Sequence, residues 1–374
     1  MTEVGPISPA RLKEILSEVP ELAETLDLHS TFQWEHFLEQ GVDSHFLARV
    51  GDLTGADSLA KASDYWKQVD YALPHEGTFT LPKDKRHVSI YSRRAFLYPQ
   101  VYAYVKLPSL SLLGNETEMN YYLGFEHGSN AFNGIACFRL MTGTTYANRL
   151  CVHIGPLNGH YVLNIDVAKP SNFSTAYHSY RVALTKNLAL FFIDSRLRAV
   201  AVQSLQGGTV AVKENTLPYS ILLTPPMPSN LTTLMELLSS RTAVAPSDLT
   251  VPLSPYRFRV SDGKEIIPLS LPLYLENNDT ALAGYSIASG SVTSHPFPIF
   301  GYDKKTILFQ ANQAGSLQLQ VYTLAGNWRT YNSDPTSANT LYKYIMAGDA
   351  MLGRIVFTPN AYPCNVTDAE VVLG

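Results

Sequence analysis

Three glutamates stand close together in the chain and could act on a sugar: Glu116, Glu118 and Glu126. Glycoside hydrolysis uses two carboxyl groups about 5–9.5 Å apart on either side of the bond that breaks. In an extended segment Glu116 and Glu118 would share one face, and Glu126 could join them from the next turn. The same spacing also fits three solvated residues in turns or at a strand edge, which is the favoured interpretation.

Histidines near the N-terminus could bind a metal only if their spacing suited one. His29, Glu35, His36 and His45 lie within one stretch, but without the HExxH pattern or another tight ligand spacing. Surface or capping histidines are therefore favoured, and the sequence predicts no metal site. Phosphate-binding glycine loops of the GxxxxGK[ST] or GxGxxG type are absent as well. We expect no cofactor.

The chain has three cysteines, Cys137, Cys151 and Cys364, with no CxxC spacing. An odd number without that spacing argues against a disulfide framework and against a zinc cluster. Buried thiols are favoured for Cys137 and Cys151, and a single bridge between them on adjacent strands is the alternative. On a strand, Cys151 and His153 would share a face, but a buried thiol is favoured over a catalytic nucleophile. No GxSxG motif is present.

Aromatic side chains offer the remaining candidate site, because tyrosine and tryptophan rings can stack on the apolar face of a sugar. Trp328, Tyr331 and Tyr342 form one candidate platform, and Tyr121 and Tyr122 form another. Cross-strand packing of aromatic residues explains the same pattern and is favoured. These five residues are the speculative ligand-binding residues of the chain.

Composition limits the classes of function. Among 374 residues there are 28 Lys and Arg and 32 Asp and Glu, so the formal charge is 28 − 32 = −4. A charged fraction of 16% is low against the usual ~25%. A nucleic-acid binder that works by bulk positive charge is excluded, and so is a disordered chain. The surface must be largely uncharged and polar, which suits packing against neighbours or binding polar ligands.

No targeting or membrane segment is visible. The N-terminal stretch MTEVGPISPARLKEILSEV has neither a basic start nor an apolar core, so it does not read as a Sec signal peptide. No run reaches 18 apolar residues, so we expect no transmembrane helix. The compartment stays unknown from the sequence, with a virion or an extracellular assembly favoured.

Charge and hydrophobic pattern divide the chain into three segments, residues 1–75, 76–252 and 253–374, with net charges of −8, +5 and −1. Sign changes of this kind support segment boundaries. The first segment reads as an acidic helical arm, with helices expected within 8–20, 31–41 and 57–67.

The other two segments read as antiparallel β-sandwiches. Short runs rich in β-branched and aromatic residues alternate with turn clusters through residues 76–225, and Asp194-Ser195 predicts a tight hairpin. A short helix near 230–239 and a Pro-rich linker follow, and a smaller sandwich completes the chain. The expected fold is mainly β: two tandem jelly-roll-like sandwiches with a short α-helical N-terminal arm.

Residues 120–140, 177–184 and 188–202 resemble the concanavalin A-like or laminin-G-like jelly-roll superfamily. One strand carries Gly124-Phe125-Glu126, matching that superfamily's glycine-aromatic-acid segment, and later strands carry YHSYRVAL and LALFFIDSRLRAVAV. The resemblance implies a jelly-roll scaffold, whose members include lectins, glycoside hydrolases, adhesion modules and viral or phage appendage domains. The Glu-x-Asp-x-Glu catalytic strand of its well-known hydrolases is absent, as is a lectin-type calcium loop.

These observations favour a non-catalytic structural or attachment protein, such as a virion, tail-fibre or appendage subunit, that associates with itself or with other structural subunits. The sequence therefore predicts that the chain is not an enzyme. A carbohydrate-binding, lectin-like module is the first alternative, with a glycan as partner. A glycoside hydrolase on the jelly-roll scaffold is the second.

Overall fold

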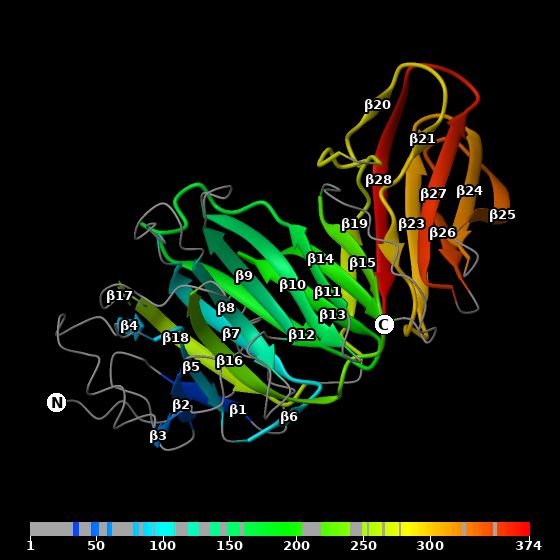
Figure 1. The fold of residues 1–374 in the computed structure, drawn as a ribbon. Helices are drawn as coiled ribbons and strands as arrows, with labels where there is room; N and C mark the ends of the chain where they lie inside the picture. Colours follow the sequence, from blue (N-terminus) through cyan, green and yellow to red (C-terminus); the bar gives the residue numbers. More distant parts are fainter. Residues whose placement is uncertain are drawn as a thin grey trace, which may run out of the picture.

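The computed structural model shows a mainly β protein made of two stacked-sheet bodies that lie side by side (Figure 1). It describes residues 33–36, 46–51, 58–61, 78–81, 85–92, 94–107, 109, 119–126, 135–142, 148–157, 161–203, 218–239, 249–252, 254–263, 266–276, 278–323, 327–346 and 350–374. In this part of the chain every regular element is a strand. Among these residues there is no helix long and apolar enough to span a membrane.

The first body pairs a seven-stranded with a nine-stranded sheet. The seven-stranded sheet runs, in spatial order, β1 (Gln33–His36), β18 (Ser254–Ser261), β7 (Gln100–Lys106), β12 (His178–Leu184), β13 (Leu188–Ile193), β14 (Arg196–Gln203) and β15 (Ser220–Thr224). The nine-stranded sheet runs β11 (Tyr161–Asp166), β10 (Arg149–Leu157), β9 (Ala136–Thr142), β8 (Met119–Glu126), β16 (Asn230–Ser239), β5 (His87–Ser92), β2 (Phe46–Gly51) and β3 (Ser58–Lys61), with β6 (Phe96–Leu97) beside β16. A separate ribbon joins β4 (Thr78–Leu81) to β17 (Leu249–Pro252).

The second body is a smaller sandwich of two five-stranded sheets. One contains β19 (Leu269–Pro272), β28 (Cys364–Leu373), β23 (Lys305–Ala311) and β26 (Tyr342–Ile345), with β20 (Ser286–Ile287) beside β28. The other contains β21 (Val292–Thr293), β27 (Leu352–Pro359), β24 (Gly315–Tyr322) and β25 (Trp328–Thr336), with β22 (Phe297–Pro298) beside β27. Its first strand, β19, begins at Leu269, whereas β18 lies beyond residue 253 yet pairs with β7 of the first body.

Aromatic side chains fill the space between the two sheets of the first body. Phe138 of β9 meets Tyr180 of β12 and Phe191 of β13 edge-on, with ring centroids 5.5 and 5.6 Å apart. All three are at most 1% exposed. Because alternate residues of a strand point to opposite faces, one face of each of these three strands supplies this core.

A second apolar core continues from the first body into the second. The outer face of β13, β14 and β15 contributes Leu190, Val200 and Ile221, which belong to the same buried cluster as Ile307 and Phe357 of the second sandwich. In Figure 1, β15 and β19 lie where the two bodies meet. The two sandwiches are therefore joined by packing as well as by the chain.

The helical N-terminal arm expected from the sequence is not supported. The expected helix at 8–20 lies outside the described residues. The one at 31–41 contains β1, which pairs antiparallel with β18, and the one at 57–67 contains β3, which pairs antiparallel with β2. Short helical patterns need a partner surface to be stable, and in these two segments strand pairing supplies the hydrogen bonds instead.

The short helix expected near 230–239 is also wrong, because this segment is the ten-residue strand β16 between β8 and β5. Leu231, Met235 and Leu237 face the sandwich core, while Leu234 and Glu236 face the other way and are equally buried. A strand buried on both faces loses the polar–apolar alternation that marks a half-buried strand. Without that alternation, the apolar run of residues 230–239 was interpreted as a helix.

Local turn and strand predictions fared better. Asp194 and Ser195 form the two-residue turn between β13 and β14, and both have positive φ angles, 48° and 59°, as such hairpin turns require. Cys137, Cys151 and Cys364 are buried free thiols, so no Cys137–Cys151 bridge is present.

Candidate functional site

The nine-stranded sheet has a second buried face, opposite the sandwich core, and this face is polar. We call it the polar face. It is formed by Asn120, Tyr122 and Glu126 of β8, Cys137, Arg139 and Met141 of β9, Arg149, Cys151 and His153 of β10, Asn164 and Asp166 of β11, Leu234 and Glu236 of β16, and His87 and Ser89 of β5. Their neighbours along each strand line the sandwich core, and the alternation of strand side chains sets them apart.

Strand register arranges the polar face in rows that cross the sheet. One row contains Glu236, Tyr122, Arg139, Cys151 and Asp166. The next contains Leu234, Gly124, Cys137, His153 and Asn164, and in a third Thr232 pairs with Glu126. Residues two apart on a strand are about 6.7 Å apart, so that distance separates neighbouring rows.

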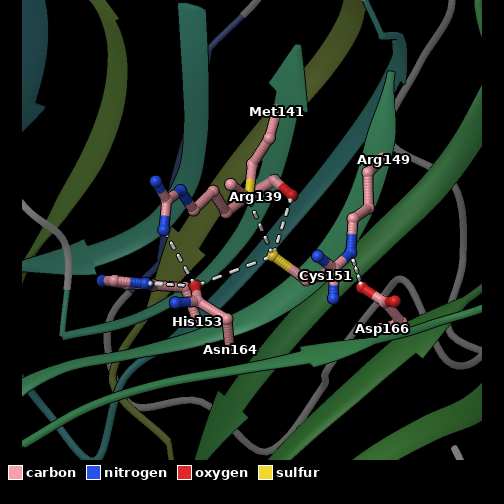
Figure 2. A network of polar contacts seen from close by, with 7 residues as sticks. All are labelled: Arg139, Met141, Arg149, Cys151, His153, Asn164 and Asp166. Carbon is pink, nitrogen blue, oxygen red and sulfur yellow. Dashed lines mark hydrogen bonds and ion pairs between the residues drawn. The ribbon is translucent and has the colours of Figure 1, made fainter. Parts of the chain in front are cut away.

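Asn164 is the centre of the hydrogen bonds on this face (Figure 2). Its Oδ1 atom accepts from His153 Nδ1 at 2.8 Å and from Arg139 Nη1 at 3.0 Å, and Cys151 Sγ lies 3.7 Å from the same oxygen. The Arg139 guanidinium also donates from Nε to Asn120 Oδ1 at 3.0 Å. One amide oxygen therefore fixes the positions of an imidazole and a guanidinium from two neighbouring strands.

Tyr122 lies at the buried end of this network. Its ring meets the His153 ring edge-on at 5.2 Å, and the Arg139 guanidinium carbon is 5.4 Å from its centroid. Burial raises the pKa of the Tyr122 hydroxyl, Arg139 opposes that shift, and Glu236 adds to it. Groups with shifted pKa values cluster at functional sites, which makes this face a candidate site.

Two of the three carboxylates of the polar face, Glu236 and Glu126, flank a glycine. Glu236 is 1% exposed and Glu126 is 3% exposed. Between their rows, Gly124 has no side chain, and a Cβ atom there would lie 2.7 Å from the Cα atom of Cys137. Burial raises the pKa of the Cys137 thiol, and the charges of Glu236 and Glu126 raise it further. Both carboxylates are therefore close to this thiol.

The β11 edge of the polar face is open to solvent, in contrast to its Tyr122 end. Asn164 is exposed. Arg149 and Asp166 form an ion pair beside it, and each has 37% of its side chain exposed. A ligand can therefore meet Asn164 and this ion pair from solvent, and the face grows more enclosed toward Glu236. Within the described ranges no group of three or more His, Cys, Asp or Glu residues is placed to hold a metal ion.

The structure separates the residues expected to bind a ligand. Tyr122 lies on the polar face, whereas Tyr121 points into the sandwich core, where it is 1% exposed and presents no ring to a ligand. Trp328, Tyr331 and Tyr342 belong to β25 and β26 of the second sandwich. The five residues thus do not form one platform.

Those three aromatic residues have different surroundings. The Trp328 ring packs under the Arg354 guanidinium at 4.3 Å and meets Tyr322 at 5.2 Å. Tyr331 is 46% exposed. The Tyr342 hydroxyl, on edge strand β26 of one sheet, donates to Asp334 on edge strand β25 of the other sheet, and the Tyr342 ring is nearly parallel to that of Tyr344 at 6.3 Å. Tyr331 is the most accessible of the three, and Trp328 and Tyr342 are partly buried.

Sequence reasoning missed most of the polar face. Glu236 was hidden in the supposed helix, and Arg139, His153 and Asn164 belong to three different strands that only the register brings together. Glu126 had been interpreted as a solvated turn or edge residue, but it is buried at the end of β8. Glu116 and Glu118 lie outside the described residues. The shared strand face of Cys151 and His153 is confirmed.

No protein-family profile and no curated protein matches the chain. Solved structures do match. The laminarinase from Flavobacterium sp. UMI-01 has 14% identity and a TM-score of 0.38, over 61% of this chain and 99% of that one. A structure of Crh5 transglycosylase in complex with NAG has 12% identity and a TM-score of 0.35, over 63% and 85%. A crystal structure of SCLam, a non-specific endo-beta-1,3(4)-glucanase, has 10% identity and a TM-score of 0.38, over 62% and 93%.

The stacked, largely antiparallel sheets of the first body agree with the jelly-roll-like sandwich that the resemblance implies. The expected virion, tail-fibre or appendage subunit is not supported: the neighbours are named as glycoside hydrolases and a transglycosylase, the class of the second alternative. The expectation that the chain is not an enzyme is likewise left without support, because these neighbours are named as enzymes. The expected self-association and the expected association with other structural subunits find no support in these comparisons.

Proposed function

We propose that the chain acts on a glycan as a glycoside hydrolase, through the polar face of its first sandwich. One observation carries the proposal. Of the acidic side chains whose burial the structure describes, the two that are buried are Glu126 and Glu236, and they lie on adjacent strands and on the same face. Burying a carboxylate is costly unless its surroundings or its use compensate.

The separation of the two carboxylates sets a condition for this role. Glu236 pairs with Tyr122 and Glu126 pairs with Thr232, so their backbones are two rows, about 13 Å, apart along the strands. Cys137 lies in the row between them, and both carboxylates raise the pKa of its thiol. Glu126 Oε1 lies 3.4 Å from Thr232 Oγ1 in its own row. The proposed role therefore requires both side chains to extend toward the Cys137 row when a sugar binds, so that the carboxyl groups reach the ~5–9.5 Å of glycoside hydrolysis.

The chemistry assigned to this pair is the hydrolysis of a glycosidic bond. One carboxylic acid donates its proton to the departing sugar oxygen while the bond from that oxygen to the anomeric carbon breaks. The second carboxylate assists the attack of water on that carbon, either directly as a base or after forming a glycosyl ester itself. Arg139, Asn120 and Asn164 supply donors and acceptors for sugar hydroxyls, and their mutual hydrogen bonds hold them in position.

The experiment is the release of reducing ends from neutral β-1,3- and β-1,4-linked glucans by the purified chain and by three variants. Glu236→Gln and Glu126→Gln keep the shape of each side chain and remove its acid–base capacity. We expect each to lower the rate at least a hundredfold. Glu370→Gln is the control, because Glu370 lies on β28 of the second sandwich. Its rate is expected to stay within twofold of the unaltered chain.

Two results would contradict the proposal. The first is an unaltered rate in both Glu236→Gln and Glu126→Gln. The second is glucan binding without any hydrolysis, which would favour the lectin-like alternative. Loss of activity in the Glu370→Gln control would point to damage of the fold instead, and unfolding curves of all three variants check this.

The aromatic residues of the second sandwich are proposed as additional glycan contacts. Trp328 is partly exposed on β25, and Arg354, which packs on its ring, is itself held by Gln320 Oε1 at 2.8 Å and Glu276 Oε1 at 2.9 Å. A ring held in place in this way loses little conformational freedom when a sugar stacks on it. Trp328→Ala is therefore expected to weaken glucan binding at least fivefold, and pull-down with insoluble glucan measures it.

A further inference from the structure

A cleft of about 830 Å³ lies where the two sandwiches meet, and no residue of the polar face lines it. The outer face of β12, β13 and β14 forms one wall, and residues 267–274 of the segment around β19 form the other. The volume is in the range of sites that take small organic ligands. Its charged lining residues are Arg181, Arg196, Arg198 and Asp279, which leaves 3 − 1 = +2.

The arginines are positioned by the sheet. Arg181 on β12 donates from Nε and Nη2 to Gln100 Oε1 at 3.2 and 2.6 Å, and its guanidinium carbon is 5.3 Å from the centroid of the Phe192 ring. On β14 the register passes from the pair Phe192–Leu197 to the pair Phe191–Ala199, so Arg198 is the extra residue of a β-bulge. Bulges redirect side chains, and they occur often beside functional sites.

Arg198 has the surroundings of an anion ligand. It is half-buried, and its Nε atom is buried without an acceptor among the residues that the structure describes. Burial lowers the pKa of its guanidinium, and the charge of Arg196 lowers it further. The nearby carboxylate of Asp194 is already engaged by His178 Nδ1 at 2.7 Å and by the backbone nitrogen of Ser179 at 3.0 Å.

We infer that this cleft binds a small ligand carrying an oxyanion, a phosphate, sulfate or carboxylate group, between Arg196 and Arg198. Such a group would supply the acceptor that Arg198 Nε lacks and would reduce the repulsion between the two arginines. Guanidinium groups bind oxyanions through paired, charge-assisted hydrogen bonds. The apolar part of the lining, with Phe192 and Tyr274, suits the body of a ligand that carries the charged group.

The test is isothermal titration of the full chain in low-salt buffer with inorganic phosphate, inorganic sulfate, glucuronate and, as a neutral control, glucose. We expect at least one oxyanion to bind, glucose not to bind at this site, and binding to weaken as NaCl is added. Preference for phosphate and sulfate over glucuronate would identify a tetrahedral group, and the reverse a carboxylate.

Matched variants locate the site. Arg198→Gln and Arg196→Gln are expected to weaken oxyanion binding at least tenfold. Arg329→Gln, which removes an exposed arginine from β25, is expected to change it less than twofold. Absence of binding by all three oxyanions would overturn the inference, and so would equal weakening by Arg329→Gln and Arg198→Gln. Arg196 is exposed, so its variant keeps the test valid if Arg198→Gln does not fold. Glucan hydrolysis should not change in these variants, so this inference and the proposed function fail independently.

Discussion

Tyr219 and His295 join the two sandwiches: their ring centroids lie 4.7 Å apart with the ring planes at 84°, and the Tyr219 hydroxyl donates to the carbonyl oxygen of Pro296 at 2.9 Å. Tyr219 directly precedes β15 of the first body, and His295 lies between β21 and β22 of the second. They are 5% and 2% exposed. The contact belongs to an apolar core shared by both bodies, and a large apolar interface restrains domain motion.

Tyr219→Ala is expected to destabilise both sandwiches together. Removing a buried aromatic ring costs about 3–5 kcal/mol, whereas Tyr219→Phe, which loses the hydroxyl contact alone, should cost about 1 kcal/mol. Urea unfolding followed by circular dichroism and by tryptophan fluorescence measures this, in a background in which Trp34 and Trp66 are replaced by Phe so that Trp328 is the fluorophore. The two signals should change together, and separate transitions in the unaltered chain would show that the interface does not couple the bodies.

Gly124→Ala is expected to destabilise the first sandwich and to abolish glucan hydrolysis. The new Cβ atom would lie 2.7 Å from Cys137 Cα and closer still to the carbonyl oxygen of Ala136, so β8 and β9 would have to move apart. The cost should reach or exceed the ~1–3 kcal/mol typical of overpacking. Thermal unfolding and the glucan assay measure it. Gly374→Ala is the control, since its Cβ would meet nothing within 4 Å. An equally small loss of stability in Gly124→Ala and Gly374→Ala would show that β8 and β9 can move apart at little cost.

Stability is expected to fall as the pH rises above about 9. Burial raises the pKa of Cys151 to about 12, and burial likewise raises the pKa values of Tyr121 and Tyr180. In the unfolded chain these groups ionise at their ordinary values, near ~8.5 for thiols and ~10 for phenols. Between the two values the unfolded state binds fewer protons than the folded state, so the free energy of unfolding decreases with pH. Urea midpoints at pH 8 and pH 10.5 check this, and equal midpoints would contradict it.

Asn164→Ala is expected to make Cys151 more reactive. Asn164 Oδ1 lies 3.7 Å from Cys151 Sγ and also holds His153 and Arg139 in place. A thiolate is the reactive form of cysteine, and a buried thiol with a raised pKa reacts slowly. With an aromatic disulfide reagent at pH 8, the native chain should react at least a hundredfold more slowly than the denatured chain. Asn164→Ala should react faster than the native chain, and Asn339→Ala, in the second sandwich, should react at the native rate. Identical rates in the native chain and both variants would show that Asn164 does not protect the thiol of Cys151.

Sequence reasoning succeeded where one strand carries its own signal. Ser316 to Thr323 alternates apolar and polar residues, and the structure contains β24 there, with Leu317 and Leu319 buried. The Asp194-Ser195 turn was predicted from two residues for the same reason. In both places the pattern depends on neighbours along the chain and not on distant partners.

Sequence reasoning failed where strands that are distant in the chain determine the burial and the partners of a side chain. Glu236 and Tyr122 are 114 positions apart in the chain and pair directly in the sheet. No local sequence pattern predicts such a pair. Because both faces of β16 are buried, its sequence also lacks the polar–apolar alternation that would have identified a strand. The polar face could have been found only by knowing the strand order, which the chain does not display in sequence.

The return of β18 to the first body has a practical consequence. After the chain has crossed to the ribbon of β4 and β17, β18 pairs with β7 and β1 before the second sandwich starts. A shortened protein that retains the first body must therefore extend at least to Ser261, because without β18 the strand β7 would become an unpaired edge of the seven-stranded sheet. Without the second sandwich, such a protein would also expose the apolar outer surface of β13, β14 and β15 and would tend to aggregate. Neither sandwich is therefore expected to serve as an independent module in a fusion protein.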